Sequence, residues 1–381
     1  MRMKKLMIFA VAAIALVACS KEFDTNKSAS NGTAIGFGTW AEQLTKSRAT
    51  GTTSFVANDE FEVYGTKTVS SAKQVVFHDV DVKFDGTNWD YAPHRFWDPA
   101  ASQYDFYAVM PKNILAAEAN EGDYAKTGLF TSSSITFDDP TANDNDILVA
   151  DHKLCEGSGD SAPYSYSTFQ SGTKVQLSFN HVATGVDLKV KQDNNLGDAV
   201  VKVTALSLLN ISNVGTFEVT AYSTDVPTVD WTDAASSVLE TVASSGEYKI
   251  LNPADDADDV TVAGKTTYTS NTASGTTGTP ATLFENYVFM PQDLDAAVQK
   301  IKISYTVQVG TEAPNVYTDI LIPIANFQQT DTDNNSGTKI ASWEPKTKYI
   351  YTITIGANVI EFTATVKDWA TTVNGYDYLL N

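Results

Sequence analysis

The sequence is poor in the residues that cross-link extracellular folds or carry out common catalysis. Its 381 residues include two cysteines and four histidines. No two histidines have a metal-binding spacing such as His-Glu-x-x-His, and no Gly-x-Ser-x-Gly motif is present. If Cys19 is used in another way, Cys155 is the only thiol left and no intrachain disulfide can form. Packing and hydrogen bonds must then hold the fold, and we expect no metal, no cofactor and no enzymatic activity.

Positive charge is scarce as well. Lysine and arginine number 26 against 46 aspartate and glutamate residues, which gives a formal net charge of −20. Such a surface repels nucleic acids and anionic membranes, so we expect neither as a partner of the folded protein. An acidic surface also keeps an abundant extracellular protein soluble.

Long apolar runs are lacking, and the run of interest lies at the start of the chain. Residues 6–17 are apolar, follow a basic start and lead into Leu16-Val17-Ala18-Cys19. This run is too short to cross about 30 Å of hydrocarbon, but it has the layout of a bacterial lipoprotein signal peptide over residues 1–18. Cys19 would then become the first residue and carry lipid on its sulfur and its amine. The alternative is an ordinary secretory signal in which a cysteine stands there by chance.

Strand patterns dominate the rest of the sequence. Helical periodicity is scarce, with short candidates at 111–119 and 293–299. Apolar and polar residues alternate with the period of antiparallel strands that have one wetted face. The clearest such segments are 175–179, 301–309, 349–355 and 360–366. The sequence therefore predicts an all-β fold of β-sandwiches, and its length allows two domains.

Composition also indicates where the chain divides. Residues 20–31 are small, polar and without pattern, as in a flexible tether. A glycine- and serine-rich stretch, 156–172, precedes the strand expected from residue 174, and we place the domain boundary there. The polar stretch 266–280 is expected to be a long surface loop, because the strand pattern does not change around it.

Two acidic segments bear on metal binding. Residues 331–335 place oxygen atoms at alternate positions, as at the start of a calcium loop. The glycine of the turn comes one residue late, at Gly337, and the twelfth position holds Ser342 instead of glutamate. Residues 255–259 form a second acidic run. Solvated loops account for both segments better, and calcium binding stays open as the lesser alternative.

Aromatic residues gather at Phe96-Trp97 and at 104–107. A sugar-binding platform uses such rings, but alternation along a strand favours packing in the core. His181 lies at the end of the strand expected from residue 174, and we expect it to be a hydrogen-bonded structural histidine.

A series of short motifs runs along nearly the whole chain. Each is loose by itself, and their order and spacing give them weight. In chain order they are Ile35-Gly-Phe37, Ser47-Arg48-Ala49, Phe61-Glu-Val-Tyr64-Gly65, Tyr104-Asp-Phe-Tyr107-Ala-Val-Met-Pro111, Asp146-Ile-Leu-Val-Ala150, Leu177-Ser-Phe-Asn-His181, Trp343-x-Pro345, Tyr349-x-Tyr351-x-Ile353, Ile360-x-Phe362 and Val366-Lys-Asp-Trp369. Together they resemble the fimbrillin family, the type V pilins that certain Gram-negative anaerobes export as lipoproteins.

The resemblance implies two tandem β-sandwich domains of the transthyretin-like type, here 49–172 and 173–381. It also implies a pilin of a cell-surface fimbria that supports adhesion, with other copies of itself and accessory fimbrial subunits as partners. The lipoprotein export machinery would deliver the chain to the outer membrane, anchored by Cys19. A trypsin-like or arginine-specific protease would then cut between Arg48 and Ala49, release residues 19–48 with the lipid, and free the subunit for the extracellular fimbrium.

The released segment carries Ile35 and Phe37, which alternate with small residues and are expected to lie as a strand over apolar surface. Its loss would leave unpaired backbone groups and uncovered apolar side chains, both costly in water. A strand from the next subunit would repair both by β-augmentation. The expected donor is the C-terminal tail, about 370–381, and its alternative is a last strand paired within its own domain. The apolar face of that tail carries Tyr376, Tyr378 and Leu380.

Other roles stay open at this point. An anchor subunit keeps its lipid and lacks cleavage, and a tip subunit lacks a donor tail. The presence of both Arg48 and the tail favours a stalk subunit over these two. A monomeric, glycan-binding surface lipoprotein is the alternative from another class of function.

Overall fold

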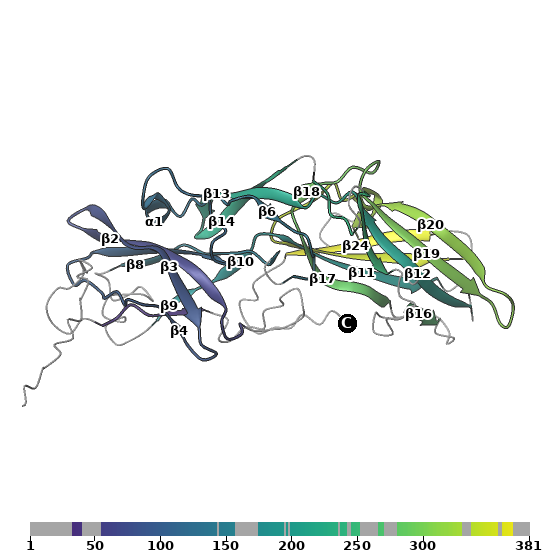
Figure 1. The fold of residues 1–381 in the computed structure, drawn as a ribbon, viewed down its shortest axis with the longest axis horizontal. Coiled ribbons are helices and arrows are strands. Elements are labelled where there is room, and N and C mark those ends of the chain that lie inside the picture. The colour runs from purple at the N-terminus through teal and green to yellow at the C-terminus, as the bar shows by residue number, and fades with distance from the viewer. Residues whose placement is uncertain are drawn as a thin grey trace, which may run out of the picture.

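The structure is a computed structural model that describes residues 33–39, 55–142, 145–156, 174–193, 196, 199–234, 237–241, 245–251, 266–269, 280–329, 337–356 and 360–368. The molecule is elongated, with the N-terminal strands at one end and the C-terminal strands at the other (Figure 1). Nearly all of its regular structure is strand, which confirms the all-β prediction; the helical elements are short and include α1 (Asp123–Thr127) and a 3₁₀ turn, η4 (Ile324–Asn326). Among the described residues, no helix is both long enough and apolar enough to span a bilayer.

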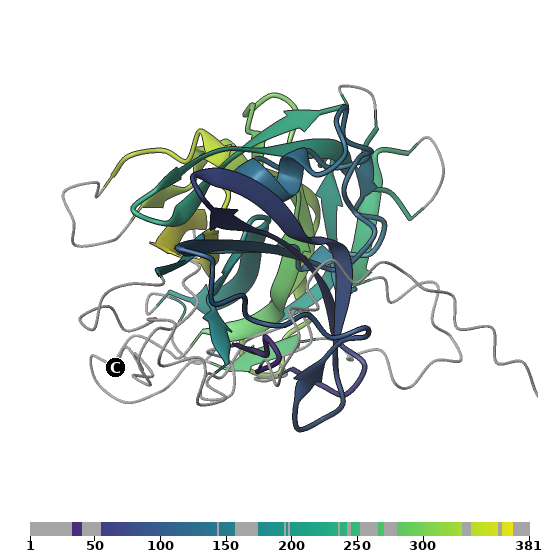
Figure 2. The same cartoon turned by 90° about the vertical axis from the view of Figure 1, so that its left-hand side faces the viewer.

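The N-terminal half is built around a seven-stranded sheet of order β10-β7-β5-β2-β3-β4, in which β8 also pairs with β5. A separate two-stranded parallel sheet, β1-β9, lies beside it. The strands of the larger sheet are β2 (Glu60–Val69), β3 (Ala72–Phe84), β4 (Trp89–Asp90), β5 (Gln103–Met110), β7 (Leu148–Ala150), β8 (Lys153–Glu156) and β10 (Phe179–His181). Those of the smaller sheet are β1 (Phe37–Thr39) and β9 (Val175–Leu177). Figure 2 views this end of the molecule.

The central strands of the larger sheet are buried on both faces. Along β5, Phe106 and Ala108 face one hydrophobic cluster while Tyr107 and Val109 face another. We call the first cluster the N-terminal core; it also includes Ile35, Phe37, Phe61, Phe77, Tyr91, Trp97, Val175, Leu177 and Phe179. The second, the middle core, joins residues from both halves of the chain, among them Tyr64, Phe130, Phe137, Val149, Phe217, Val219, Val288 and Met290. The apolar run 106–110 in β5 thus reflects a sheet with no wetted face at its centre.

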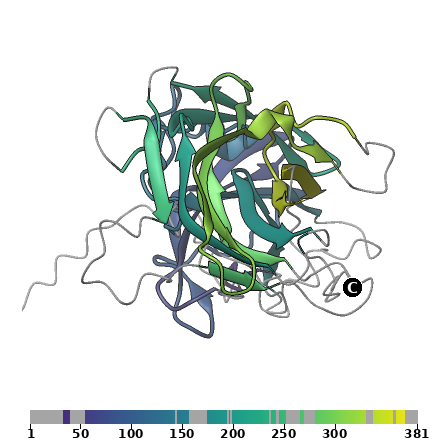
Figure 3. The same ribbon diagram turned by 90° about the vertical axis from the view of Figure 1, so that its right-hand side faces the viewer.

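The C-terminal half has two five-stranded sheets that share one core. Their orders are β17-β11-β23-β24-β21 and β15-β12-β19-β20, with β16 paired to β12 in the second. The first sheet comprises β11 (Thr184–Gln192), β17 (Ala281–Phe289), β21 (Gln328–Gln329), β23 (Thr347–Ile355) and β24 (Ile360–Asp368). The second comprises β12 (Val200–Leu209), β15 (Glu247–Leu251), β16 (Thr266–Thr269), β19 (Lys300–Gln308) and β20 (Asn315–Pro323). Figure 3 views this end.

The shared core follows from alternation in the facing strands. Val186, Leu188 and Val190 on β11 are buried, as are Ile301, Ile303, Tyr305 and Val307 on β19. With Phe327, Tyr349, Tyr351 and Ile353 they belong to one cluster, which we call the C-terminal core. Burying alternate side chains from both sheets gives the packing of a sandwich.

A hairpin joins the two halves. It consists of β13 (Val214–Ser223) and β14 (Val226–Asp233), and β6 (Ile135–Thr136) extends it as a third strand. Phe217 and Val219 of β13 contribute to the middle core. A further short pair, β18 (Gln292–Asp293) with β22 (Ser342–Trp343), lies within the C-terminal half. Apart from residue 156, the expected boundary stretch 156–172 lies outside the described residues, so the division into two domains stays a prediction.

Several local expectations were wrong. The strand expected over 175–179 is two strands, because β9 pairs with β1 whereas β10 pairs with β7, and the carbonyl of Ser178 between them accepts the Asp151 N–H at 2.7 Å. Part of the expected loop 266–280 is strand β16, paired with β12.

Neither helix candidate is helical. In 111–119, Ala116 N–H donates to the Thr131 carbonyl and Ser133 N–H to the Ile114 carbonyl, so the backbone bonds to a neighbouring segment instead of to itself. In 293–299, only one turn closes, where Val298 and Gln299 both donate to the Asp295 carbonyl.

Candidate functional site at the first strand

Residues 33–39 lie between two segments that are distant in sequence. On one side, β1 runs parallel to β9, with Phe37 beside Val175, and the Val175 N–H donates to the Gly36 carbonyl at 2.8 Å. On the other side, the Ile35 N–H donates to the Arg95 carbonyl at 2.8 Å. The Trp97 N–H donates to the Thr33 carbonyl at 3.1 Å on the same side. This short segment therefore satisfies backbone groups of both neighbours.

Phe37 is fully buried in the N-terminal core. Its ring meets four other rings edge-on or tilted, at centroid distances of 5.3–6.3 Å, namely those of Phe61, Phe77, Tyr91 and Phe106. These separations and tilts are those that aromatic pairs prefer. Strands β2, β3 and β5 of the large sheet supply three of the four rings. Phe37 is therefore a central side chain of that core, although it comes from a strand of three residues.

The residues around Phe37 are fixed by polar contacts. The Tyr91 hydroxyl donates to the Ile35 carbonyl at 2.7 Å, and the Trp89 indole donates to Thr39 Oγ1 at 3.2 Å. Ile35 and Thr39 are each 1% exposed. Sequence reasoning named Ile35 and Phe37 but missed Tyr91 and the parallel partner β9. The local signal was the alternation of Ile35 and Phe37 with small residues; no local pattern indicated that Tyr91 or β9 would be their partners.

The other expected site residues cannot be placed. Cys19, Arg48, Ala49 and the tail residues Tyr376, Tyr378 and Leu380 all lie outside the described residues. The same is true of the acidic segments 255–259 and 331–335, so calcium binding there stays untested. The last described residue is Asp368, at the end of β24.

The aromatic cluster and His181 are structural. Trp97, Tyr104 and Tyr107 are buried, and the Trp97 and Tyr104 rings pack edge-on at 4.7 Å, as expected for core residues and not for an exposed sugar platform. His181 is buried, and its Nδ1 lies 2.5 Å from Asp146 Oδ1. The histidine therefore has the structural hydrogen bond that the sequence predicted.

Comparison with known proteins shows the family of this β-rich chain. A family model described as fimbrillin-like matches residues 47–369. The chain belongs to the fimbrillin-like family. This confirms the resemblance seen in the sequence motifs and supports a place among cell-surface fimbrial and adhesion proteins.

Solved structures similar to this fimbrillin-like chain share little sequence with it. A fimbrial protein from Bacteroides vulgatus is 18% identical with a TM-score of 0.49, over 81% of this chain and 93% of that one. A fimbrilin from Porphyromonas gingivalis is 11% identical with a TM-score of 0.34, over 90% and 95%. The tip fimbrial protein Mfa3 from the same species, with a C-terminal truncation, is 11% identical with a TM-score of 0.35, over 86% and 98%. No curated protein matches the chain.

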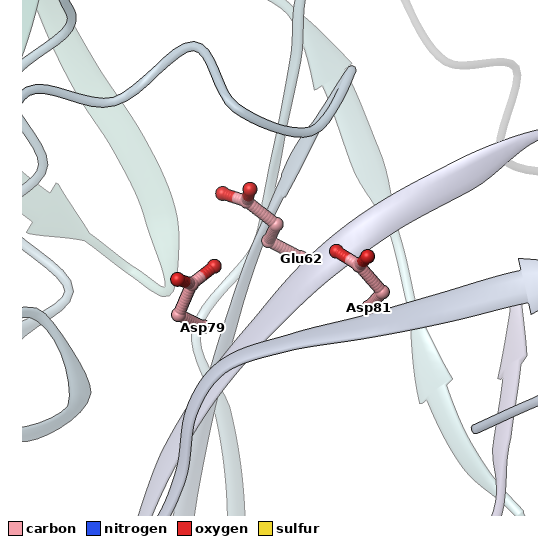
Figure 4. A group of neighbouring side chains, drawn as sticks. All are labelled: Glu62, Asp79 and Asp81. Atoms are coloured by element: carbon pink, nitrogen blue, oxygen red, sulfur yellow. The ribbon is translucent and has the colours of Figure 1, made fainter. Parts of the chain in front are cut away.

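One acidic cluster of the fimbrillin-like chain was not foreseen. Oxygen atoms of Glu62, Asp79 and Asp81 lie within 4.8 Å of one another, as their carboxylates turn toward a common region in Figure 4. Burial raises the pKa of the Glu62 carboxyl. However, Glu62 Oε1 accepts the Asn113 N–H at 2.6 Å and Oε2 accepts the Tyr64 hydroxyl at 3.3 Å. Since both oxygens of the buried carboxylate already have protein partners, the cluster is explained without a metal ion.

A second polar cluster surrounds Asp105 of β5, which is 2% exposed. Its carboxylate lies 3.0 Å from His152 Nε2 and 3.2 Å from Lys73 Nζ, and Gln103 Nε2 donates to it. Burial alone raises the pKa of this carboxyl, but the hydrogen bond from His152 and the charge of Lys73 outweigh burial, so its pKa lies below the usual value. A buried anion with these partners stabilises the fold while it stays ionised.

Proposed function

We propose that this fimbrillin-like chain is a stalk subunit of a cell-surface fimbria that is exported as a lipoprotein, cut after Arg48 and joined to the next copy by donor-strand exchange, in support of adhesion. The observation that carries the proposal is Phe37. It completes the N-terminal core from a three-residue strand, and Arg48 lies in the sequence between that strand and β2.

Removing residues 33–39 would have a definite cost. Full burial of Ile35 and Phe37 is worth roughly 1.5–3 kcal/mol each, so their loss amounts to about 3–6 kcal/mol before any relaxation. The N–H groups of Val175 and Trp97 would lose the acceptors that Gly36 and Thr33 provide. Cleavage after Arg48 would thus turn a finished core into one that needs a replacement strand.

These contacts also define what a replacement must offer. It must pair with β9, and it must point apolar side chains at alternate positions into the N-terminal core, as Ile35 and Phe37 do. The sequence of the tail, with Tyr376, Tyr378 and Leu380 at alternate positions, has this pattern. In this proposal the tail of one subunit occupies the position of β1 in the next.

The N-terminal residue of the protein recovered from fimbriae tests the cleavage step. Ala49 is expected for the assembled form, and Arg48→Ala is expected to leave the chain uncut and unassembled. Lys46→Ala is the matched control, because it removes a nearby charge but keeps the arginine. An acylated Cys19 in the assembled form would indicate an anchor subunit or a plain lipoprotein instead.

A chain truncated after Trp369 tests the donor step. It lacks Tyr376, Tyr378 and Leu380 and is expected to be cut normally but to form no heat-resistant ladder on a denaturing gel. If the truncated chain still forms such ladders, the tail is not the donor. If assembled fimbriae contain subunits whose own residues 33–39 still pair with β9, strand exchange at this position is wrong altogether.

A further inference from the structure

Three side chains meet on one face of the C-terminal half. Strand β11 lies between β17 and β23, antiparallel to the first and parallel to the second. Asp187 of β11 stands between Asn286 of β17 and Lys348 of β23. Lys348 lies beside Gly185 in the pairing of β23 with β11. Since glycine has no side chain, the side chain of Lys348 has no β11 side chain directly opposite it. The site is independent of the strand exchange proposed above.

The local backbone brings the asparagine into this group. The pairing of β17 with β11 shifts register between Val186 and Leu188, and Asn286 at this irregularity has a left-handed φ of 57°. Asparagine tolerates that conformation better than most residues. The Asn286 N–H donates to Asp187 Oδ1 at 2.7 Å, which holds the turn against the central strand.

A hydrogen bond and an ion pair hold the three side chains together. Lys348 Nζ lies 2.8 Å from Asn286 Oδ1 and 3.1 Å from Asp187 Oδ2. The side chains of Asp187 and Lys348 are 8% and 21% exposed, so water is largely kept from the carboxylate. An amine, a carboxamide carbonyl and a proton acceptor therefore occupy one site.

We propose that Lys348 and Asn286 form an intramolecular isopeptide bond, with Asp187 as the catalytic acid–base. The Lys348 ammonium gives a proton to Asp187, and the neutral amine attacks Cγ of Asn286. Asp187 then protonates the amide nitrogen of Asn286 as the Cγ–N bond breaks, and the second proton lost by the attacking nitrogen passes to the departing ammonia. A secondary amide and one ammonium ion result, Asp187 is regenerated, and no oxidant or other reactant is needed.

The bond would give this fold a covalent link that its cysteines do not supply. Cys155 is a buried free thiol, and the chain has only one other cysteine. An amide between Asn286 and Lys348 would tie β17 to β23 across β11 and close a loop of the chain. Such a loop restricts the unfolded state as a disulfide does.

The same chain contains a matched control. Lys339 Nζ contacts Asn326 Oδ1 at 2.9 Å at an exposed position, and among the described residues no carboxylate forms an ion pair with Lys339. If contact between lysine and asparagine were sufficient, this pair would react as well. The proposal predicts that it does not, because none of the described carboxylates is placed to accept a proton from Lys339 and water competes freely.

Mass spectrometry of the purified full chain tests the proposal. The expected result is a mass about 17 Da below the sequence mass and a branched tryptic peptide joining the Asn286 and Lys348 segments. Lys348→Arg and Asp187→Asn are expected to restore the unlinked mass, after allowance for the substitution, whereas Lys339→Arg keeps the loss. Lys348→Arg should also lower the thermal midpoint by roughly 10 °C.

The wild-type chain alone can overturn the proposal, so the test does not depend on a variant that folds. A full sequence mass with separate Asn286 and Lys348 peptides means that the three groups form only an ion pair and hydrogen bonds. A loss of ammonia without the branched peptide means succinimide formation at an asparagine, and it also overturns the proposal.

Discussion

The N-terminal and C-terminal cores are closed in different ways. The C-terminal core is made by long strands such as β11, β12, β19 and β23, each of nine or ten residues with many backbone bonds. The N-terminal core is completed by β1, a strand of three residues that is remote in sequence from its partners. Few backbone bonds hold β1, yet it carries fully buried side chains. One core is therefore closed by long strands, and the other depends on a three-residue strand that the proposed cleavage would remove.

The sharpest way to break this comparison is to remove β1 and the residues before it. A chain that begins at Ala49 lacks Ile35 and Phe37, and we expect it to lose about 3–6 kcal/mol of stability, confined to the N-terminal half. Hydrogen exchange should speed up at β9 and Trp97 and stay unchanged at β11 and β23. Added peptide 33–39 should restore protection, whereas a peptide with Phe37→Ala should not. Equal loss of protection at β11 would show that the cores are not independent.

Single truncations of buried rings give the next largest effect. Phe37→Ala and Phe327→Ala each remove a fully buried phenylalanine, one from each core, and each is expected to cost about 3–5 kcal/mol in the full chain. The chain that begins at Ala49 distinguishes the two cores. It already lacks Phe37, and Phe327→Ala is expected to cost as much stability in it as in the full chain. Both costs are measured by denaturant-induced unfolding, monitored by hydrogen exchange at β9 for the N-terminal half and at β11 for the C-terminal half. A Phe37→Ala chain as stable as wild type would mean that β1 does not close the core.

A change of pH should change the stability of the N-terminal half through Asp105 of β5. The pKa of Asp105 is lower in the folded state than in the unfolded chain, where it is about 3.9. Its contribution to the free energy of unfolding is therefore present above the unfolded pKa and is lost as the pH falls through the lower folded pKa. Asp105→Asn is expected to cost about 1–3 kcal/mol at neutral pH and to flatten the loss of stability below about pH 4. Urea midpoints at pH 7 and pH 3 measure this. Asp230→Asn, on an exposed position of β14, is the control and should change neither midpoint.

The same contrast explains what the sequence could foretell. Strands β19, β23 and β24 followed from alternation, because each has one face on the C-terminal core and local pattern sets both faces. The break at Ser178 did not follow, because Val175, Leu177 and Phe179 alternate without interruption. That break depends on partners, β1 for β9 and β7 for β10, which the local pattern does not encode.

The candidate sites show the same limit. Ile35 and Phe37 were named from their spacing, but the four rings that receive Phe37 come from residues far along the chain. Asp187, Asn286 and Lys348 gave no signal, because each sits on a different strand and their meeting depends on a register shift in β17. Tertiary pairing creates such sites, and a period-two pattern predicts a strand but not the strands with which it will pair.

The smallest expected effect concerns a glycine of β1. A Cβ at Gly38 would lie 2.6 Å from Gln176 Nε2, the end of a flexible side chain that can move, so Gly38→Ala should cost less than about 1 kcal/mol. Gly65→Ala is the matched control in β2, where the Cβ would lie 2.7 Å from the Asp105 carbonyl oxygen, which is backbone, and we expect about 1–3 kcal/mol. Thermal midpoints of the two variants measure the difference. A larger cost at Gly38 would show that β1 is held as tightly as the central strands, and an exchangeable strand would then be untenable.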